Sequence, residues 1–195
     1  MRDRPLAVAA WSVGSAVFAV TLAVGITVAV AGWSHASPAG PPALAAPSAA
    51  GAGLLPTGTV SLESADAAGR FVTITGEFGT LATAGTDDEA ATFEVVAGLS
   101  NPECFSLRTP DGRYLRHSSW RLRSSPDEGT VLFRGDATFC PREGSAAGSV
   151  VLESQNYPGW FLRHVGDDLW VDRSDGTAGF RADSTFHVRS PLAGK

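Results

Sequence analysis

Two stretches of the chain, residues 113–139 and 160–186, repeat one another at a constant offset of 47 residues. Arg113-Tyr114-Leu115-Arg116-His117 aligns without a gap on Trp160-Phe161-Leu162-Arg163-His164, and Phe139 then falls on Phe186. A period of this length is the signature of a repeated structural unit, and it constrains the fold more strongly than local propensity does. A polar residue that occupies equivalent places in both copies is therefore either a requirement of the fold or part of a duplicated site.

A third and weaker copy lies upstream. Val60-Ser61-Leu62-Glu63-Ser64 resembles Val150-Val151-Leu152-Glu153-Ser154, and Thr92-Phe93 corresponds to Thr138-Phe139. The chain is therefore predicted to contain three units, at residues 59–102, 103–148 and 149–195.

Short apolar runs alternate with turn signals such as Asp111-Gly112 and Pro158-Gly159, and this pattern predicts four strands in each unit. The units contain no sustained helical period. Twelve short strands in three units favour an all-β fold, a β-trefoil, because a closed barrel removes exposed sheet edges. A propeller with three blades would fall below the usual number of blades, so the trefoil is preferred.

The first 33 residues have a different composition. No charged residue occurs from Leu6 to Trp33, and as a helix this stretch would be about 42 Å long, against about 30 Å of bilayer hydrocarbon. Its length favours a retained N-terminal membrane anchor (residues 6–33) over a cleaved signal peptide, but the small residues near Ser34-His35-Ala36 keep cleavage open. Arg2 and Arg4 favour an inside N-terminus. Both alternatives export the C-terminal part, as an anchored extracellular domain or as a secreted one.

Residues 34–58 are rich in Ala, Pro, Gly and Ser, which predicts a disordered linker, so the globular domain covers residues 59–195. Its two cysteines, Cys104 and Cys140, would meet oxidising conditions, and an even count then predicts one disulfide. The first and last strands of unit two carry them, and such strands are neighbours in a three-fold β unit. Two cysteines supply too few ligands for zinc. We therefore expect no metal, and the sequence indicates no cofactor.

The chain carries 15 Lys and Arg against 20 Asp and Glu, for a formal net charge of −5. Because binding to phosphate backbones needs a basic face, nucleic acid is excluded as a partner. Arg113, Arg116, Arg121 and Arg123 form a local cluster, but alternation along strands divides them between faces. We interpret these arginines as solvated or paired, and we expect a monomer.

The polar residues that recur in both twin units are His117 with His164 and Asp136 with Asp183. Each His ends the second strand of its unit and each Asp precedes the last, so the two can meet at the mouth of a shallow pocket. A carboxylate that accepts two hydroxyl protons beside a flat imidazole suits the vicinal hydroxyls of a sugar. The structural alternative is a turn cap and a satisfied carbonyl. Binding is favoured because unit one, with Ile74 in place of the His, also lacks the aligned Asp.

Three motifs closely resemble the arabinofuranose-binding (AbfB) domain, which is carbohydrate-binding module family 42. They are Gly112–His117, Leu132–Pro141 (LFRGDATFCP) and Val151–Gly159 (VLESQNYPG). The resemblance covers about residues 59–195. It implies a β-trefoil that binds α-L-arabinofuranosyl side chains of hemicellulose, such as arabinoxylan or arabinan, with the family's pocket His at His117 and His164 and its pocket Asp at Asp136 and Asp183.

Further candidates for ligand binding within these motifs are Tyr114, Glu153, Asn156 and Tyr157. For the two tyrosines, packing in the core or at a rim is an equal alternative. The chain departs from the family at Ser118 and Val165, where a larger residue often follows the His, and at Arg108, where Glu is frequent. These departures affect the identity and affinity of the sugar and not the fold.

The family is usually attached to a glycoside hydrolase domain, and this sequence contains no recognisable one. A glycosidase needs two carboxylates about 5–9.5 Å apart across one bond, whereas Asp136 and Asp183 belong to separate units and therefore to separate pockets. No activated Ser or Cys arrangement occurs either. The sequence predicts a non-catalytic sugar-binding module. A cell-surface adhesion or sensing module for envelope glycans or a protein, and a remnant of an α-L-arabinofuranosidase, remain open alternatives.

Overall fold

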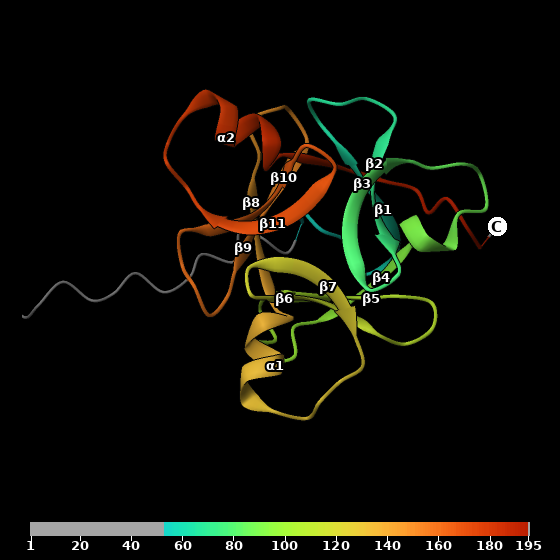
Figure 1. Ribbon diagram of the computed structural model, residues 1–195, viewed down its shortest axis with the longest axis vertical. Helices are drawn as coiled ribbons and strands as arrows, with labels where there is room; N and C mark the ends of the chain where they lie inside the picture. The colour runs from blue at the N-terminus through green and yellow to red at the C-terminus, as the bar shows by residue number, and fades with distance from the viewer. Residues whose placement is uncertain (1–52, 195) are drawn as a thin grey trace, which may run out of the picture. The chain divides into compact units, whose positions relative to one another are not determined.

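The computed structural model describes residues 53–194, which form an all-β domain of 12 antiparallel strands with few, short helices (Figure 1). The strands divide four to each unit, as the repeat predicts. Unit one contains β1 (Gly58–Ser64), β2 (Arg70–Thr75), β3 (Phe78–Thr83) and β4 (Phe93–Ala97). Unit two contains β5 (Phe105–Arg108), β6 (Tyr114–Ser118), β7 (Arg121–Ser125) and β8 (Phe139–Glu143). Unit three contains β9 (Ser149–Ser154), β10 (Trp160–Val165), β11 (Asp168–Arg173) and β12 (Phe186–Arg189).

Six strands pair in a closed circuit that runs β1–β4–β5–β8–β9–β12 and back to β1. The other six form three hairpins, β2–β3, β6–β7 and β10–β11. The hairpins pair with one another through β3, β7 and β11, and Figure 1 shows them gathered around a common centre. Because neighbouring units share strand pairs, a loop of one unit lies against the strands of the unit before it.

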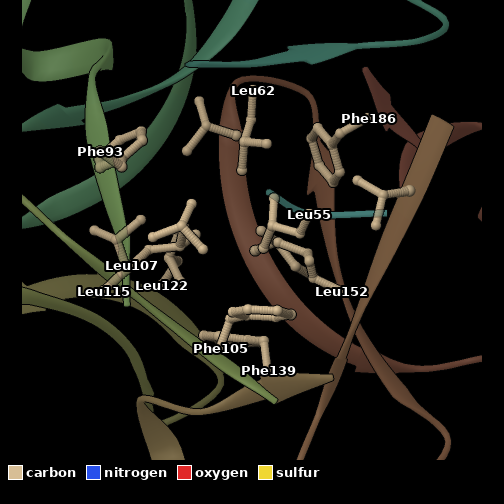
Figure 2. Packing of buried hydrophobic residues seen from close by; sticks show 14 of the residues in the cluster. Leu55, Leu62, Phe93, Phe105, Leu107, Leu115, Leu122, Phe139, Leu152 and Phe186 are labelled. Atoms are coloured by element: carbon tan, nitrogen blue, oxygen red, sulfur yellow. The ribbon is translucent and has the colours of Figure 1, made fainter. Parts of the chain in front are cut away.

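The buried core repeats with the sequence. Leu62, Leu107 and Leu152 come from the first strands, and Phe93, Phe139 and Phe186 from the last strands; each is at most 1% exposed. Figure 2 shows these six side chains in one cluster. Aromatic and branched residues suit the half-buried pleated surface of a strand. Because they recur at equivalent positions in the three units, each unit contributes the same residues to the core.

Two short helices, α1 (Val131–Asp136) and α2 (Ala178–Asp183), differ from the expectation of strands and loops alone. The preceding threonines, Thr130 and Thr177, cap them: each side chain accepts a hydrogen bond from the backbone N–H three residues on. Six residues are too few for a helical period to be recognised in a sequence. The helices fill the space before the last strand of units two and three.

Unit one has only a 3-10 turn at the corresponding place, η2 (Glu89–Ala91). In units two and three, by contrast, Asp136 and Asp183 are the last residues of α-helices, where the sequence had predicted a loop before a strand. The helix fixes the backbone of each Asp and so gives its carboxylate a defined direction.

The disulfide prediction is confirmed: Cys104 and Cys140 are bonded, with Cα atoms 4.5 Å apart. Cys104 directly precedes β5, and Cys140 is the second residue of β8, so β8 continues past the bridge instead of ending at it. The pairing of β5 with β8 at Phe105 and Phe139 brings the two cysteines together.

The predicted anchor at residues 6–33, and the predicted linker up to residue 52, lie outside the described residues. Between residues 53 and 194 no helix is long and apolar enough to cross a bilayer. Leu55, which the sequence places at the end of the linker, is 1% exposed and belongs to the core cluster. The packed part of the chain therefore begins before residue 59.

Candidate functional site

The first candidate site lies between units two and three. His117 comes from β6, Asp136 from the end of α1, and Asn156 from the loop between β9 and β10. The His117 Nε2 atom lies 3.4 Å from Asp136 Oδ1 and 3.2 Å from Asn156 Oδ1. The Asn156 side-chain amide donates to Asp136 Oδ1 over 2.7 Å, and the Ser154 hydroxyl donates to Asn156 Oδ1 over 2.8 Å. The structure thus brings together three of the residues that the sequence singles out.

Burial favours the neutral form of the His117 imidazole. Burial lowers the pKa of His117 below its usual value of 6.5, and the nearby Arg116 adds to this, although Asp136 and the hydrogen bond with Asn156 oppose the shift. Because oxygen acceptors surround Nε2, we assign the proton of the neutral ring to that atom. The other ring nitrogen, Nδ1, is then a hydrogen-bond acceptor.

Arg116 connects the carboxylates around this site. Its guanidinium lies 3.8 Å from Asp136 Oδ2 and 3.1 Å from Glu128 Oε1, and it stacks 5.2 Å from the centre of the Phe133 ring. Arg163 repeats the arrangement in unit three, between Asp172, Asp183 and the Phe180 ring. The two repeated arginines therefore orient the repeated Asp side chains.

Aromatic rings form one wall of the first site. Trp120 stacks on His117 with ring centres 5.7 Å apart, and on Trp160 at 4.1 Å, while Tyr157 meets His117 edge-on at 5.4 Å. Trp120 reaches this position through a strained turn, because Ser119 and Trp120 have φ angles of 49° and 66°. Residues other than glycine rarely adopt such angles without a compensating role.

A cavity of about 460 Å³ opens at this wall. Its lining includes Arg116, His117, Trp120, Asp136 and Tyr157. His117 and Asp136 are only 4% and 6% exposed, so they form the floor of the cavity, while Tyr157 at 37% forms part of its edge. The sequence-predicted couple is therefore close together and reachable from one side.

The second copy lies between units three and one, where a residue that the sequence analysis missed completes it. His164 Nε2 is 3.0 Å from Asp66 Oδ1, and one ligand atom from each of Asp66, His164 and Asp183 lies within 4.8 Å of the others. Asp66 follows Ser64 as Asn156 follows Ser154. Extending the alignment of the first unit by two residues would have found it.

The two copies differ in chemistry. Asp66 places a carboxylate where the first site has the amide of Asn156. Burial raises the pKa of Asp66, but hydrogen bonds from Ser64 and His164 outweigh it and hold this pKa below its usual value. Ala67 and Asp167 stand at the places of Tyr157 and Trp120, so the second site has an acidic surround and no aromatic wall at these two positions. Although Asp66, His164 and Asp183 are possible metal ligands, the guanidinium of Arg163, 3.6 Å from Asp183 Oδ2, already supplies positive charge.

The corresponding place in unit one has Ile74 where the other two units have a His. A cavity of about 280 Å³ is lined there by Ile74, Glu89 and Asp111 among others, and Ile74 offers no hydrogen bond. Another cavity, of about 490 Å³, lies against Glu94 and Arg108, which pair with each other. Volume alone therefore does not distinguish the first site; the hydrogen-bonded network of His117, Asp136 and Asn156 does.

Two candidates from the sequence lie outside the first site. The carboxylate of Glu153 accepts a hydrogen bond from the Gly159 backbone N–H over 2.7 Å and pairs with Arg142 at 2.9 Å, so it braces the β9–β10 loop. Tyr114 packs edge-on against Phe133 and does not line the cavity.

Each clustered arginine has a carboxylate partner: Arg113 with Asp111, Arg116 with Glu128, Arg121 with Asp168 and Arg123 with Glu77.

The fold and these contacts define a three-repeat all-β domain with polar pockets between neighbouring units. Residues 76–188 match the model of the alpha-L-arabinofuranosidase B (ABFB) domain. The chain therefore belongs to the ABFB-domain family.

The curated relatives are longer than this chain. A probable alpha-L-arabinofuranosidase B of Aspergillus clavatus is 36% identical over 91 residues, which are 46% of this chain and 18% of that protein. An arabinofuranosidase/B-xylosidase of Trichoderma koningii is 37% identical over 84 residues, or 42% of this chain and 17% of that protein. The chain thus spans less than a fifth of these relatives, and no catalytic domain is evident in the matched part.

Solved structures give the same relationship in three dimensions. A GH54 α-L-arabinofuranosidase soaked with a cyclic sulfate inhibitor superposes with a TM-score of 0.63 at 29% identity, over 71% of this chain and 32% of that one. An arabinofuranosidase complexed with arabinofuranosyl-alpha-1,2-xylobiose gives 0.62 at 29% identity, over 72% and 32%. Both resemble this chain over about a third of their own length.

Proposed function

We propose that the domain binds α-L-arabinofuranosyl groups of hemicellulose, such as arabinoxylan or arabinan, without catalysing a reaction. The observation that carries the proposal is the network of His117, Asp136 and Asn156 on the floor of an open cavity in a member of the ABFB-domain family. The closed circuit of six strands with three hairpins further supports the assignment of a β-trefoil.

The network suits a sugar because two of its members, Asp136 and His117, each keep a hydrogen-bond acceptor that the rest of the network does not occupy. Oδ1 of Asp136 is engaged by Asn156, but Oδ2 has only Arg116 at 3.8 Å and can accept a hydroxyl proton. Nδ1 of neutral His117 can accept another. The ring of Tyr157 at the edge of the cavity can cover an apolar face of the sugar. A furanose with adjacent hydroxyls matches these groups.

The contacts of the two carboxyls in the second site argue against hydrolysis. Asp66 and Asp183 approach one another there, and a retaining glycosidase places two carboxyls about 5–5.5 Å apart. One of the pair must act as a general acid, which requires a raised pKa. Hydrogen bonds lower the pKa of Asp66, so it does not suit that role, and the carboxyl of Asp183 lies 3.6 Å from the guanidinium of Arg163, an arrangement that suits an ion pair. We therefore expect no release of nitrophenolate from 4-nitrophenyl α-L-arabinofuranoside by the purified protein.

Two pockets that each bind weakly would together bind one polymer with higher affinity, because the second contact becomes intramolecular after the first has formed. We place this function outside the cell, with the domain secreted or held at the membrane by residues 6–33, and we expect it to act as a monomer. The secreted alternative and the anchored one differ in the mass of the mature protein, which mass spectrometry measures.

The test is calorimetric titration of the protein with methyl α-L-arabinofuranoside and with arabinoxylan oligosaccharides. His117→Ala should weaken binding at the first site at least tenfold, about 1.4 kcal/mol, because it removes an acceptor and exposes Asp136. His187→Ala is the matched control, since His187 pairs with Glu63 across strands β12 and β1 and lies outside the cavity lining. Equal binding by the two variants, or no heat with any arabinose-containing ligand, contradicts the proposal.

A further inference from the structure

Helix α1 exposes two large apolar side chains to solvent. Val131 is 88% exposed and Leu132 is 64% exposed, and Tyr157 at 37% also ranks among the exposed large hydrophobic residues of the described chain. Single exposed apolar residues are ordinary on protein surfaces, but adjacent ones beside a cavity mark sites of binding. We call Val131, Leu132 and Tyr157 the apolar rim.

The helix does not need these residues for its own stability. Its internal copy, α2, has Ala178 and Gly179 at the places of Val131 and Leu132. Both helices keep the same threonine cap and the same inward-facing aromatic, Phe133 or Phe180, with exposures of 0% and 4%. The fold is therefore satisfied without a large apolar pair at the start of the helix, so the pair in α1 is not a requirement of the fold.

The apolar rim is continuous with the polar floor of the first site. Leu132 and Tyr157 line the same cavity as His117 and Asp136. Its volume of about 460 Å³ lies in the range that accommodates drug-sized ligands, more than one pentose needs. A ligand whose furanose occupies the floor would carry its next substituent toward Leu132.

The charge around the rim limits the substituent. Glu128 lines the cavity beside Leu132, and its partner Arg116 is already shared with Asp136. These carboxylates would repel a negatively charged substituent, whereas they would not repel a neutral one. A flat neutral aromatic group also stacks favourably against Tyr157 and buries the side chain of Leu132.

We propose that the first site recognises an arabinofuranosyl group bearing a neutral aromatic substituent, which packs on the apolar rim. The inference rests on the proposed sugar binding at the same floor. The second site, which has Ala67, Ala178 and Gly179 at the equivalent places, is expected to bind the bare sugar without this preference.

Three probes test the rim: methyl α-L-arabinofuranoside, 4-nitrophenyl α-L-arabinofuranoside, and methyl α-L-arabinofuranoside acylated at O5 by a cinnamoyl group. The second carries its aromatic ring on the glycosidic oxygen and the third carries it as an ester, so the pair distinguishes the two sources of such a group. We expect at least one aromatic probe to bind about tenfold more tightly than the methyl glycoside, which is the effect of burying a Leu-sized apolar area.

The substitution Leu132→Ala should remove most of that preference and leave the affinity for the methyl glycoside within about twofold. Val165→Ala, at a 47% exposed position that does not line the cavity, is the matched control and should keep the preference. Gly179, the counterpart of Leu132 in α2, indicates that a small residue is tolerated at this helical position, and thermal melting checks that the variant folds.

The outcomes separate the two proposals. If the methyl glycoside does not bind, sugar recognition itself fails. If it binds and neither aromatic probe is preferred, or the preference survives Leu132→Ala, the rim proposal alone is overturned. A dimer in sedimentation that depends on Leu132, with no aromatic preference, would assign the rim to a second copy of the chain and also overturn it.

Discussion

The side-chain amide of Asn156 lies 2.7 Å from Oδ1 of Asp136 and joins the third unit to the last residue of helix α1 in the second. Asn156 also places its carbonyl oxygen 3.2 Å from His117 Nε2. The site is thus shared by two repeats, and its geometry depends on the pairing of β8 with β9 that aligns them.

Replacing Asn156 tests this connection. Asn156→Ala removes the donor to a carboxylate that is only 8% exposed, and a buried acceptor left without its partner costs about 1–3 kcal/mol. We expect the free energy of unfolding in urea to fall by that amount and sugar binding to weaken with it. Gln155→Ala is the control, because Gln155 contacts Ser100 at the surface. Equal stability of the two variants would contradict a structural role for Asn156.

The neutral state of His117 predicts a pH dependence of stability. Its pKa is lowered in the folded protein from about 6.5 in the unfolded chain. Between the folded pKa and 6.5 the unfolded state binds more protons, so stability is greatest above 6.5 and falls as pH drops through that window. Melting temperatures from pH 7.5 to 5 should decline more steeply for the parent than for His117→Gln. Parallel curves would show that His117 does not contribute.

The strained turn before β7 separates stability from binding. Ser119→Gly should stabilise the protein by about 1 kcal/mol, because glycine adopts the φ of 49° without steric cost. Binding should be unchanged, since Trp120 keeps its place. Trp120→Gly relieves the same kind of strain but removes the stack on His117 and Trp160, so it should weaken sugar binding severalfold. Denaturant titration and calorimetry on both variants measure the two effects.

The disulfide should stabilise the domain without taking part in binding. It closes a loop with a sequence separation of 36 residues, for which about 2–4 kcal/mol is typical. The variant with both Cys104→Ser and Cys140→Ser should lose that much free energy of unfolding and retain sugar affinity at temperatures where it is folded. The parent protein with reductant added should have the same free energy of unfolding as the double variant. A difference between them would indicate that the serines themselves disturb the fold.

Much of the candidate site could be predicted from repetition. The offset of 47 residues pairs His117 with His164 and Asp136 with Asp183, and the structure brings each His close to the Asp of its own unit. The helices that end at these Asp residues were not predictable, because they are too short to leave a period. Asp66 was missed because it lies just past the aligned segment Val60–Ser64, differs from its counterpart Asn156, and has its partner His164 98 residues away in the chain.

The sequence by itself determined the number of units, the strands in each and the repeated His and Asp, because identical spacing in separate copies leaves few alternatives. It determined the disulfide because the chain has only two cysteines. The tertiary structure decided which loop faces which His. That choice depends on how the strand circuit closes, so that Asn156 completes one pocket and Asp66 the other. The two pockets consequently differ in charge and in aromatic content, although both contain the same repeated His and Asp.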